Sequence, residues 1–250
     1  MKRMLCGLLV LLALLFLGGP AWAENFLKMR HVSEPFEVMG QRQSGSEEIV
    51  EIWLSGNRAR MNSSDNSSVI LDGDRQVMFM LDHAEQTYTE VPLNLGEAMS
   101  GMFGGQEGGQ DMAAMMSQMM GAMMQVRAEV VDTGTTKTVN EWTCRVYELT
   151  LNMPMGKTVS EICASEEIDV DVSMYNKIGH AMLAGQQGFE ELLREMEKIA
   201  GVAVLTVSRA NIMGATMVTR EELLEHRKMA APAGSFDIPD GYMKQRFMGM

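Results

Sequence analysis

Short apolar segments separated by turn-forming residues fill the first half of this chain, and they constrain its fold most. Six segments of strand-like composition lie at residues 26–32, 48–54, 59–62, 69–72, 76–81 and 87–91. Between them stand turn formers such as Ser55-Gly56-Asn57 and Asp72-Gly73-Asp74. This spacing predicts an antiparallel meander. The segment 48–54 carries apolar residues at both odd and even positions, so we expect it to be covered on both sides.

The second half mixes further strands with helices. Strand-like segments recur at residues 126–132, 136–139, 143–151, 157–163, 202–208 and 213–219. Helical periodicity predicts helices at residues 95–102, 111–124, 170–183 and 189–200. We therefore expect an α+β fold, a curved antiparallel sheet with a few helices, in one domain over residues 24–250. A Gly- and Met-rich helical insertion interrupts that domain at about residues 95–125.

The first 23 residues have the pattern of a secretory signal peptide. Lys2 and Arg3 precede an apolar run at residues 5–17, and Ala21-Trp22-Ala23 places small residues at the cleavage site. We predict cleavage after Ala23 and export to the periplasm or the extracellular space. No downstream run approaches the roughly 20 apolar residues of a membrane-spanning helix.

The net charge of the chain limits the classes of partner that it can bind. Loss of Lys2 and Arg3 moves the formal net charge from −12 to −14. An acidic chain without a basic cluster is a poor partner for nucleic acid, whose binding depends on Lys and Arg. The acidic doublets are expected on solvated faces or at strand ends, because no His or nucleophile motif adjoins them; they are Glu47-Glu48, Glu166-Glu167, Glu190-Glu191 and Glu221-Glu222.

Two cysteines, Cys144 and Cys163, remain after removal of the signal segment. An even number in an oxidising compartment predicts a disulfide. A thiol metal site or a redox pair is the alternative, but the spacing is not Cys-x-x-Cys and no His lies nearby.

Several strings resemble a bacterial family of exported proteins of unknown function, numbered 4412 among such domains. The strings are Glu51-Ile52-Trp53-Leu54-Ser55-Gly56-Asn57-Arg58-Ala59-Arg60, Ile70-Leu71-Asp72, Tyr88, Thr136-Lys137-Thr138-Val139, Trp142-Thr143-Cys144-Arg145-Val146-Tyr147 and Ile238-Pro239-Asp240-Gly241-Tyr242. That family is similar to the outer-membrane lipoprotein carriers (LolA/LolB-like), so the resemblance implies an incomplete antiparallel barrel with helices over its open apolar side. Glu141 stands where the family pattern has a glycine, so the turn there is expected to differ.

A methionine tract is the main functional candidate. Nine of the 27 methionines lie between Met99 and Met124, and seven share one face of the expected helix: Met112, Met115, Met116, Met119, Met120, Met123 and Met124. If the barrel analogy holds, this helix covers an apolar groove. Either it fills the groove permanently, in a purely structural protein, or it moves aside for a lipid, an acyl chain, or a lipidated or apolar partner, because methionine surfaces repack around varied shapes.

Copper is the alternative ligand. Thioether sulfur selects Cu(I), and M-x-x-M and M-x-x-x-M spacings link Met115, Met116, Met119, Met120, Met123 and Met124. Met153-Pro154-Met155 offers a further pair, and an oxidant sink is a third role for such methionines. No cofactor is required by the first interpretation.

An enzyme is the least supported class. His31, His83, His180 and His226 are scattered, and the sequence has no nucleophile-elbow, zinc-protease or phosphate-loop motif.

Overall fold

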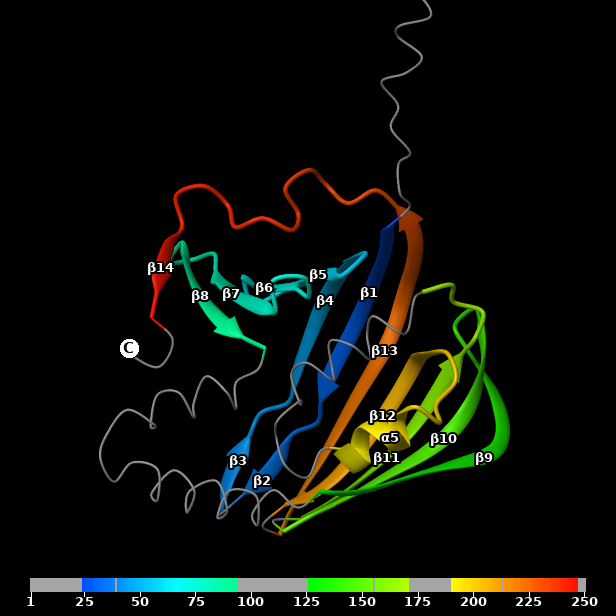
Figure 1. Ribbon diagram of the computed structural model, residues 1–250. Helices are drawn as coiled ribbons and strands as arrows, with labels where there is room; N and C mark the ends of the chain where they lie inside the picture. The colour runs from blue at the N-terminus through cyan, green and yellow to red at the C-terminus, as the bar shows by residue number, and fades with distance from the viewer. Residues whose placement is uncertain are drawn as a thin grey trace, which may run out of the picture.

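The computed structural model describes residues 24–38, 40–93, 126–154, 156–170, 190–212 and 214–246. Twelve strands from these residues form one sheet, in the order β14-β8-β7-β6-β5-β4-β1-β13-β12-β11-β10-β9 (Figure 1). Neighbouring strands are antiparallel except β14, which runs parallel to β8. The short strands β2 (Phe36–Val38) and β3 (Gln41–Gln43) pair separately.

The long sheet combines an N-terminal meander with a C-terminal one. Its strands are β1 (Glu24–Ser33), β4 (Ser46–Ser55), β5 (Arg58–Ser63), β6 (Ser67–Asp72), β7 (Val77–Asp82), β8 (Thr87–Pro92), β9 (Arg127–Val139), β10 (Trp142–Met153), β11 (Gly156–Ser165), β12 (Val202–Ile212), β13 (Ala215–Met229) and β14 (Met243–Gln245). β1 joins the two meanders because it pairs with both β4 and β13. One short helix, α5 (Glu190–Met196), completes the described residues.

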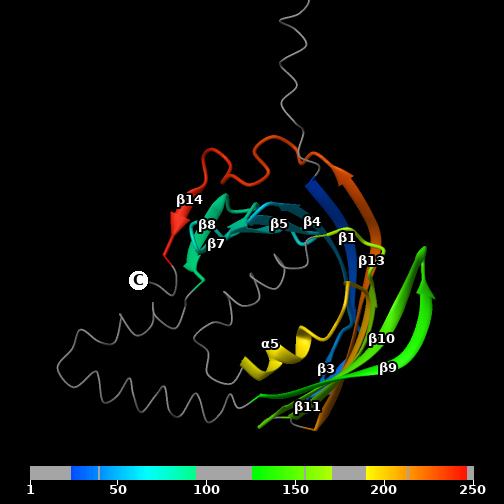
Figure 2. The ribbon, with the colours of Figure 1, turned by 45° about the vertical axis from the view of Figure 1, so that its right-hand side comes forward.

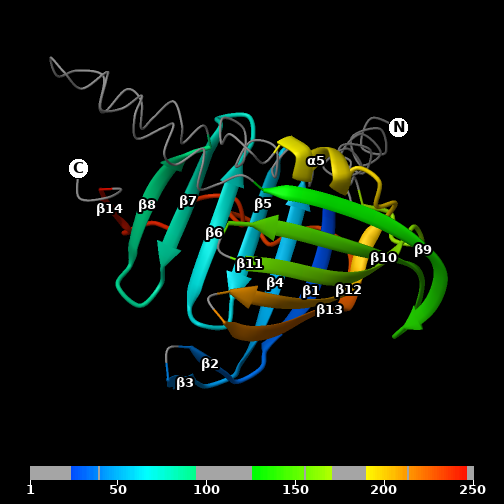
Figure 3. The ribbon, with the colours of Figure 1, turned by 90° about the horizontal axis from the view of Figure 1, so that it is seen from below.

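The sheet is curved, and α5 lies within the curve (Figure 2). Seen from below, the strands β9 to β11 cross the direction of β4 to β8 (Figure 3). The pairing register divides the side chains between two faces. Phe26, Trp53, Arg60, Ile70 and Phe79 are cross-strand partners in turn and point to one side, which we call the outer face.

The opposite side is the inner face. Leu27 pairs with Ile52, and Ile52 pairs with Met61. His31 lies four residues after Leu27 on β1, so its side chain points to the same side as that of Leu27. His31 is the cross-strand partner of Glu221, Glu221 is the partner of Thr206, and Thr206 is the partner of Ile162. Ile162 belongs to the apolar cluster that includes Leu192 of α5. The helix therefore covers the same side of the sheet as Leu27.

The main core contains Leu27, Ile52, Leu54 and Leu71 together with residues of β10 to β13. The expected double coverage of the segment 48–54 is confirmed at its end. Trp53, on the outer face, is 8% exposed, while Ile52 and Leu54 on the inner face are also buried.

The expected α+β fold, with several helices covering an incomplete barrel, is wrong. The described residues are nearly all strand, in a large open sheet with one short helix. The helix expected at residues 189–200 is present only as α5, and turns replace its last part. The helices expected at residues 95–102, 111–124 and 170–183 lie outside the described residues, apart from Val170 in a loop.

Two predicted strand boundaries are also wrong. The segments 126–132 and 136–139 are one continuous strand, β9. β13 extends ten residues past the expected end at Thr219, to Met229. Partners on both sides, β12 and β1, satisfy the backbone of β13 and override the helical composition of Glu221 to Arg227.

Candidate functional site

Six apolar side chains of the inner face remain partly exposed, and they form the candidate site. They are Met29, Val50, Met61, Val69, Met78 and Met80, and we call them the methionine face. Met29 pairs with Val50, and Met61 pairs with Val69, which in turn pairs with Met80. Met78 lies two residues from Met80 and therefore on the same side.

The methionine face lies next to the main core and is in contact with it. Met29, Val50, Met61 and Met78 pack against the main core cluster, whereas Met80 is 49% exposed. Four of the six side chains are thioethers, which are flexible and polarizable and adapt to irregular shapes. Such a surface can hold an apolar group by contact alone, without positioning it through hydrogen bonds.

The outer face of the same strands is sealed by the chain itself. Ile238 and Tyr242 pack against the buried cluster of Ile70, Phe79 and Leu81. We call residues 230–242, which run past β4 to β8 on the way to β14 in Figure 1, the C-terminal strap. Its Phe236 ring lies 4.9 Å from the guanidinium carbon of Arg58. No comparable segment of the described residues lies on the methionine face beside Met80.

A hydrogen-bond network fastens the strap. His83 lies between Tyr242 and Ser68, with its Nδ1 2.5 Å from the Tyr242 hydroxyl and its Nε2 2.5 Å from Ser68 Oγ. Ser68 donates to Asn62 Oδ1, so its oxygen is left to accept the Nε2 proton. In this tautomer Nδ1 accepts a hydrogen bond from the Tyr242 hydroxyl. Arg60 donates to the Ser235 carbonyl at 3.1 Å, and burial lowers the pKa of its guanidinium.

A serine bonded to a histidine suggests nucleophilic catalysis, but this pair is unsuited to it. Ser68 is 2% exposed and already bonded to Asn62 and Arg60 as well as His83. A nucleophile must reach a substrate. The network therefore holds the strap to the sheet.

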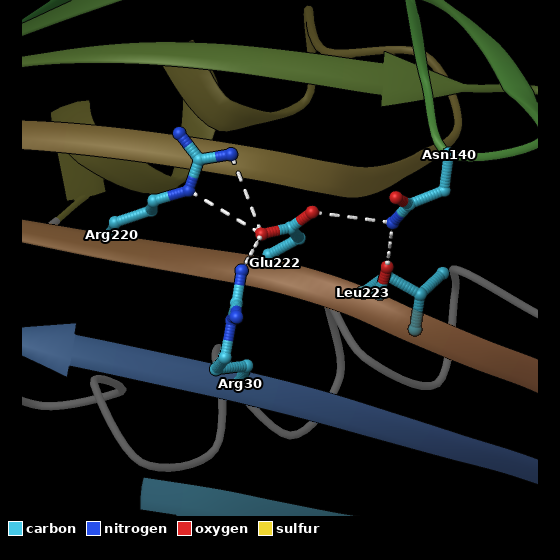
Figure 4. A network of polar contacts seen from close by, with 5 residues as sticks. All are labelled: Arg30, Asn140, Arg220, Glu222 and Leu223. Atoms are coloured by element: carbon cyan, nitrogen blue, oxygen red, sulfur yellow. Dashed lines mark hydrogen bonds and ion pairs between the residues drawn. The ribbon is translucent and has the colours of Figure 1, made fainter. Parts of the chain in front are cut away.

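A buried carboxylate lies between β1, β13 and the turn after β9 (Figure 4). Glu222 accepts a hydrogen bond from Arg30 at 2.7 Å, a longer one from Arg220 at 3.4 Å, and one from Asn140 at 3.3 Å. Burial alone favours the protonated acid, but the Arg30 hydrogen bond and the two arginine charges outweigh it and lower the pKa of Glu222. The expectation that the doublet Glu221-Glu222 is solvated is wrong for Glu222, which is 7% exposed.

The same turn explains the departure at Glu141. Asn140 has a φ of 54°, a left-handed conformation that asparagine adopts more readily than most residues. Its side chain also donates to the Leu223 carbonyl at 2.9 Å. The turn is thus built on Asn140, and Glu141 needs no glycine-like conformation.

A polar pocket of about 430 Å³ lies between α5 and the start of β9. Arg127, Glu129, Asn152 and Glu191 contribute to its lining. Glu195 accepts the backbone N–H of Val130 at 2.7 Å and also binds Lys198. The Lys198 hydrogen bond and then the Val130 one lower the pKa of Glu195. Glu195 thus binds a backbone group on the edge of β9 that is left unpaired among the described strands. This structural role accounts for its position in the pocket lining without a bound ligand.

The structure brings one predicted pair together. Cys144 and Cys163 form a disulfide with an S–S distance of 2.11 Å and Cα atoms 5.3 Å apart, which confirms that prediction. The seven methionines from Met112 to Met124, proposed as a groove cover or Cu(I) ligands, lie outside the described residues together with His180. Of the described histidines, His31 contacts Glu221 and His226 contacts Asn25, away from His83. The described residues contain no cluster of three His, Cys, Asp or Glu side chains suited to a metal ion.

Sequence reasoning missed the methionine face. Met29, Met61, Met78 and Met80 each lie inside a predicted strand, so alternation could have placed them on a common side. The available signal was the pair Met78 and Met80, two positions apart in the predicted strand at residues 76–81. The denser tract after Met99 obscured that signal.

Comparison with known sequences identifies the family. No curated protein matches the chain. No helix among the described residues is long and apolar enough to cross a membrane. The family model described as Domain of unknown function (DUF4412) matches residues 38–242, from β2 to the Tyr242 end of the C-terminal strap. The chain belongs to the DUF4412 family.

Proposed function

We propose that the protein is an exported envelope protein that binds an acyl chain, carried by a lipid or a lipidated protein, on the methionine face. The observation that supports this most is the contrast on strands β4 to β7. The outer side is closed by the C-terminal strap, whereas the inner side leaves Met80 half exposed beside three further methionines. Contiguous exposed apolar surface usually marks a binding site.

Export is supported by two features. The first 23 residues have the composition of a signal peptide. The Cys144–Cys163 disulfide is typical of proteins that mature in an oxidising compartment.

The chemistry of the face favours an acyl chain. Strands β1, β4, β5, β6 and β7 are neighbours in the sheet, so at about 4.8 Å per strand the face spans roughly 19 Å. Thioethers repack around a flexible chain, and each buried methylene contributes about 0.8 kcal/mol. We also propose that the family is related to the outer-membrane lipoprotein carriers, which would imply the same class of ligand.

Uptake of a fluorescent fatty acid by the delipidated mature chain, residues 24–250, tests the proposal. We expect saturable binding by the wild type and about tenfold weaker binding by Met80→Asp, because a carboxylate on the face disfavours apolar contact. Met243→Asp is the matched control, since Met243 is 66% exposed and lies on β14, outside the face. It should bind like the wild type.

Native mass spectrometry of the protein purified without detergent gives a second measurement. We expect a lipid adduct that is lost on delipidation. If the purified protein carries no lipid and the delipidated protein takes up no fatty acid, the proposal is wrong.

A further inference from the structure

Met80 is the most accessible thioether of the methionine face. It is 49% exposed, while Met29, Met61 and Met78 are partly buried and pack against the core. Exposure governs how readily a methionine sulfur meets a dissolved oxidant. The four sulfur atoms therefore differ in reactivity, and Met80 is expected to react first.

We propose that Met80 is an oxidation site that controls apolar binding on the inner face, a regulation that rests on the function proposed above. Hydrogen peroxide transfers one oxygen atom to the Met80 sulfur. The O–O bond breaks, an S=O bond forms, the sulfur loses two electrons, and the peroxide is reduced to water. A dithiol reductase of the methionine sulfoxide class removes the oxygen as water and becomes a disulfide.

The surroundings of Met80 favour a stable sulfoxide. Its cross-strand partners are Val69 on β6 and Thr89 on β8. Directly opposite side chains have Cβ atoms about 5 Å apart, so the Thr89 hydroxyl is within reach of a sulfoxide oxygen. Because Met80 is 49% exposed, the added oxygen can also remain in solvent, so we expect the strand to stay folded.

The consequence for binding follows from the position of Met80. Val69 links Met80 to Met61 across β6, so a sulfoxide places a strong acceptor directly beside the apolar row. An acyl chain that contacts this row must desolvate the sulfoxide without offering it a donor. Oxidation should weaken acyl binding, and reduction should restore it.

Peptide mapping tests the site independently of binding. Cleavage before Asp74 and Asp82 releases residues 74–81, which contain both Met78 and Met80. With limiting peroxide we expect Met80 to oxidise several-fold faster than Met78 in the folded protein and at the same rate in urea. Equal rates in the folded protein would overturn the proposal.

Binding measurements before and after oxidation test the regulation. We expect the fatty-acid Kd of the wild type and of Met243→Leu to rise about tenfold on oxidation, and to return after reductase treatment. For Met80→Leu the ratio of the two Kd values should stay near one. A tenfold rise in Met80→Leu overturns the regulation while leaving the proposed function intact. Absence of uptake by unoxidised wild type overturns both, and the circular dichroism of each oxidised sample must match its untreated form.

Discussion

The two faces of strands β4 to β7 are built from alternate residues of the same segments, yet they differ in how they are closed. The outer face buries Ile70 and Phe79 under the C-terminal strap, to 1% and 4% exposure. The inner face carries Met80, the neighbour of Phe79, at 49% exposure. Both faces contain buried core residues, such as Leu27 on the inner side. They differ beside Met80, where the described residues leave apolar surface of the inner face in contact with solvent.

Shortening one side chain on each face should give the largest difference in the free energy of unfolding. Ile70→Ala removes a buried side chain from the outer cluster and is expected to lower the free energy of unfolding by about 3 kcal/mol. Met80→Ala should cost less than about 1 kcal/mol, because half of its side chain is already in solvent. Urea unfolding of both variants measures the contrast. Equal losses would mean that the inner face is packed as tightly as the outer one.

The adjacent acids Glu221 and Glu222 allow a second comparison, between an exposed and a buried carboxylate. Glu222→Gln should cost about 2 kcal/mol, because Arg30 and Arg220 lose their buried anionic partner. Glu221→Gln is the matched control. Its side chain is 52% exposed and contacts only His31 among the ion pairs, so the expected loss is below about 0.5 kcal/mol. A similar loss for both variants would contradict the role assigned to the buried network.

The strands of the N-terminal meander could be predicted because their signals are local. Turn residues such as Gly56 and Asn66 adopt the positive φ values that their turns require, at 55° and 71°. Between the turns, apolar alternation marks β5 to β8. The disulfide was equally accessible, since only two cysteines remained to pair.

The features that escaped prediction depend on partners distant in the sequence. Glu222 is buried because Arg30, 192 residues away, lies beside it. His83 bonds to Tyr242 across 159 residues. The composition of residues 221–227 favours helix locally, and only pairing with β1 makes it strand. The methionine face likewise requires the register of five strands, which no single segment reveals.

Loosening the strap tests whether the outer face depends on it. Tyr242→Phe removes the hydroxyl bonded to His83 Nδ1 and should lower the free energy of unfolding by about 1 kcal/mol. Limited proteolysis should also cut residues 230–242 faster. Met243→Leu, at the next and more exposed position, should change neither quantity. Unaltered stability and proteolysis in Tyr242→Phe would show that apolar packing alone holds the strap.

Mild acidification should change the free energy of unfolding least, through a histidine of β13. His226 is the cross-strand partner of Leu27, and its Nε2 lies 3.0 Å from Asn25 Oδ1. Burial, followed by the charge of Lys228, lowers the pKa of His226 below its ordinary value of 6.5. The unfolded chain therefore takes up this proton before the folded one does, so the stability from His226 is present above about pH 6.5 and is lost as the pH falls through the folded pKa. Urea unfolding at pH 7.5 and 5.5 should show a smaller decrease in His226→Gln than in the wild type, because glutamine does not titrate. Identical decreases would contradict the assignment of this pH dependence to His226.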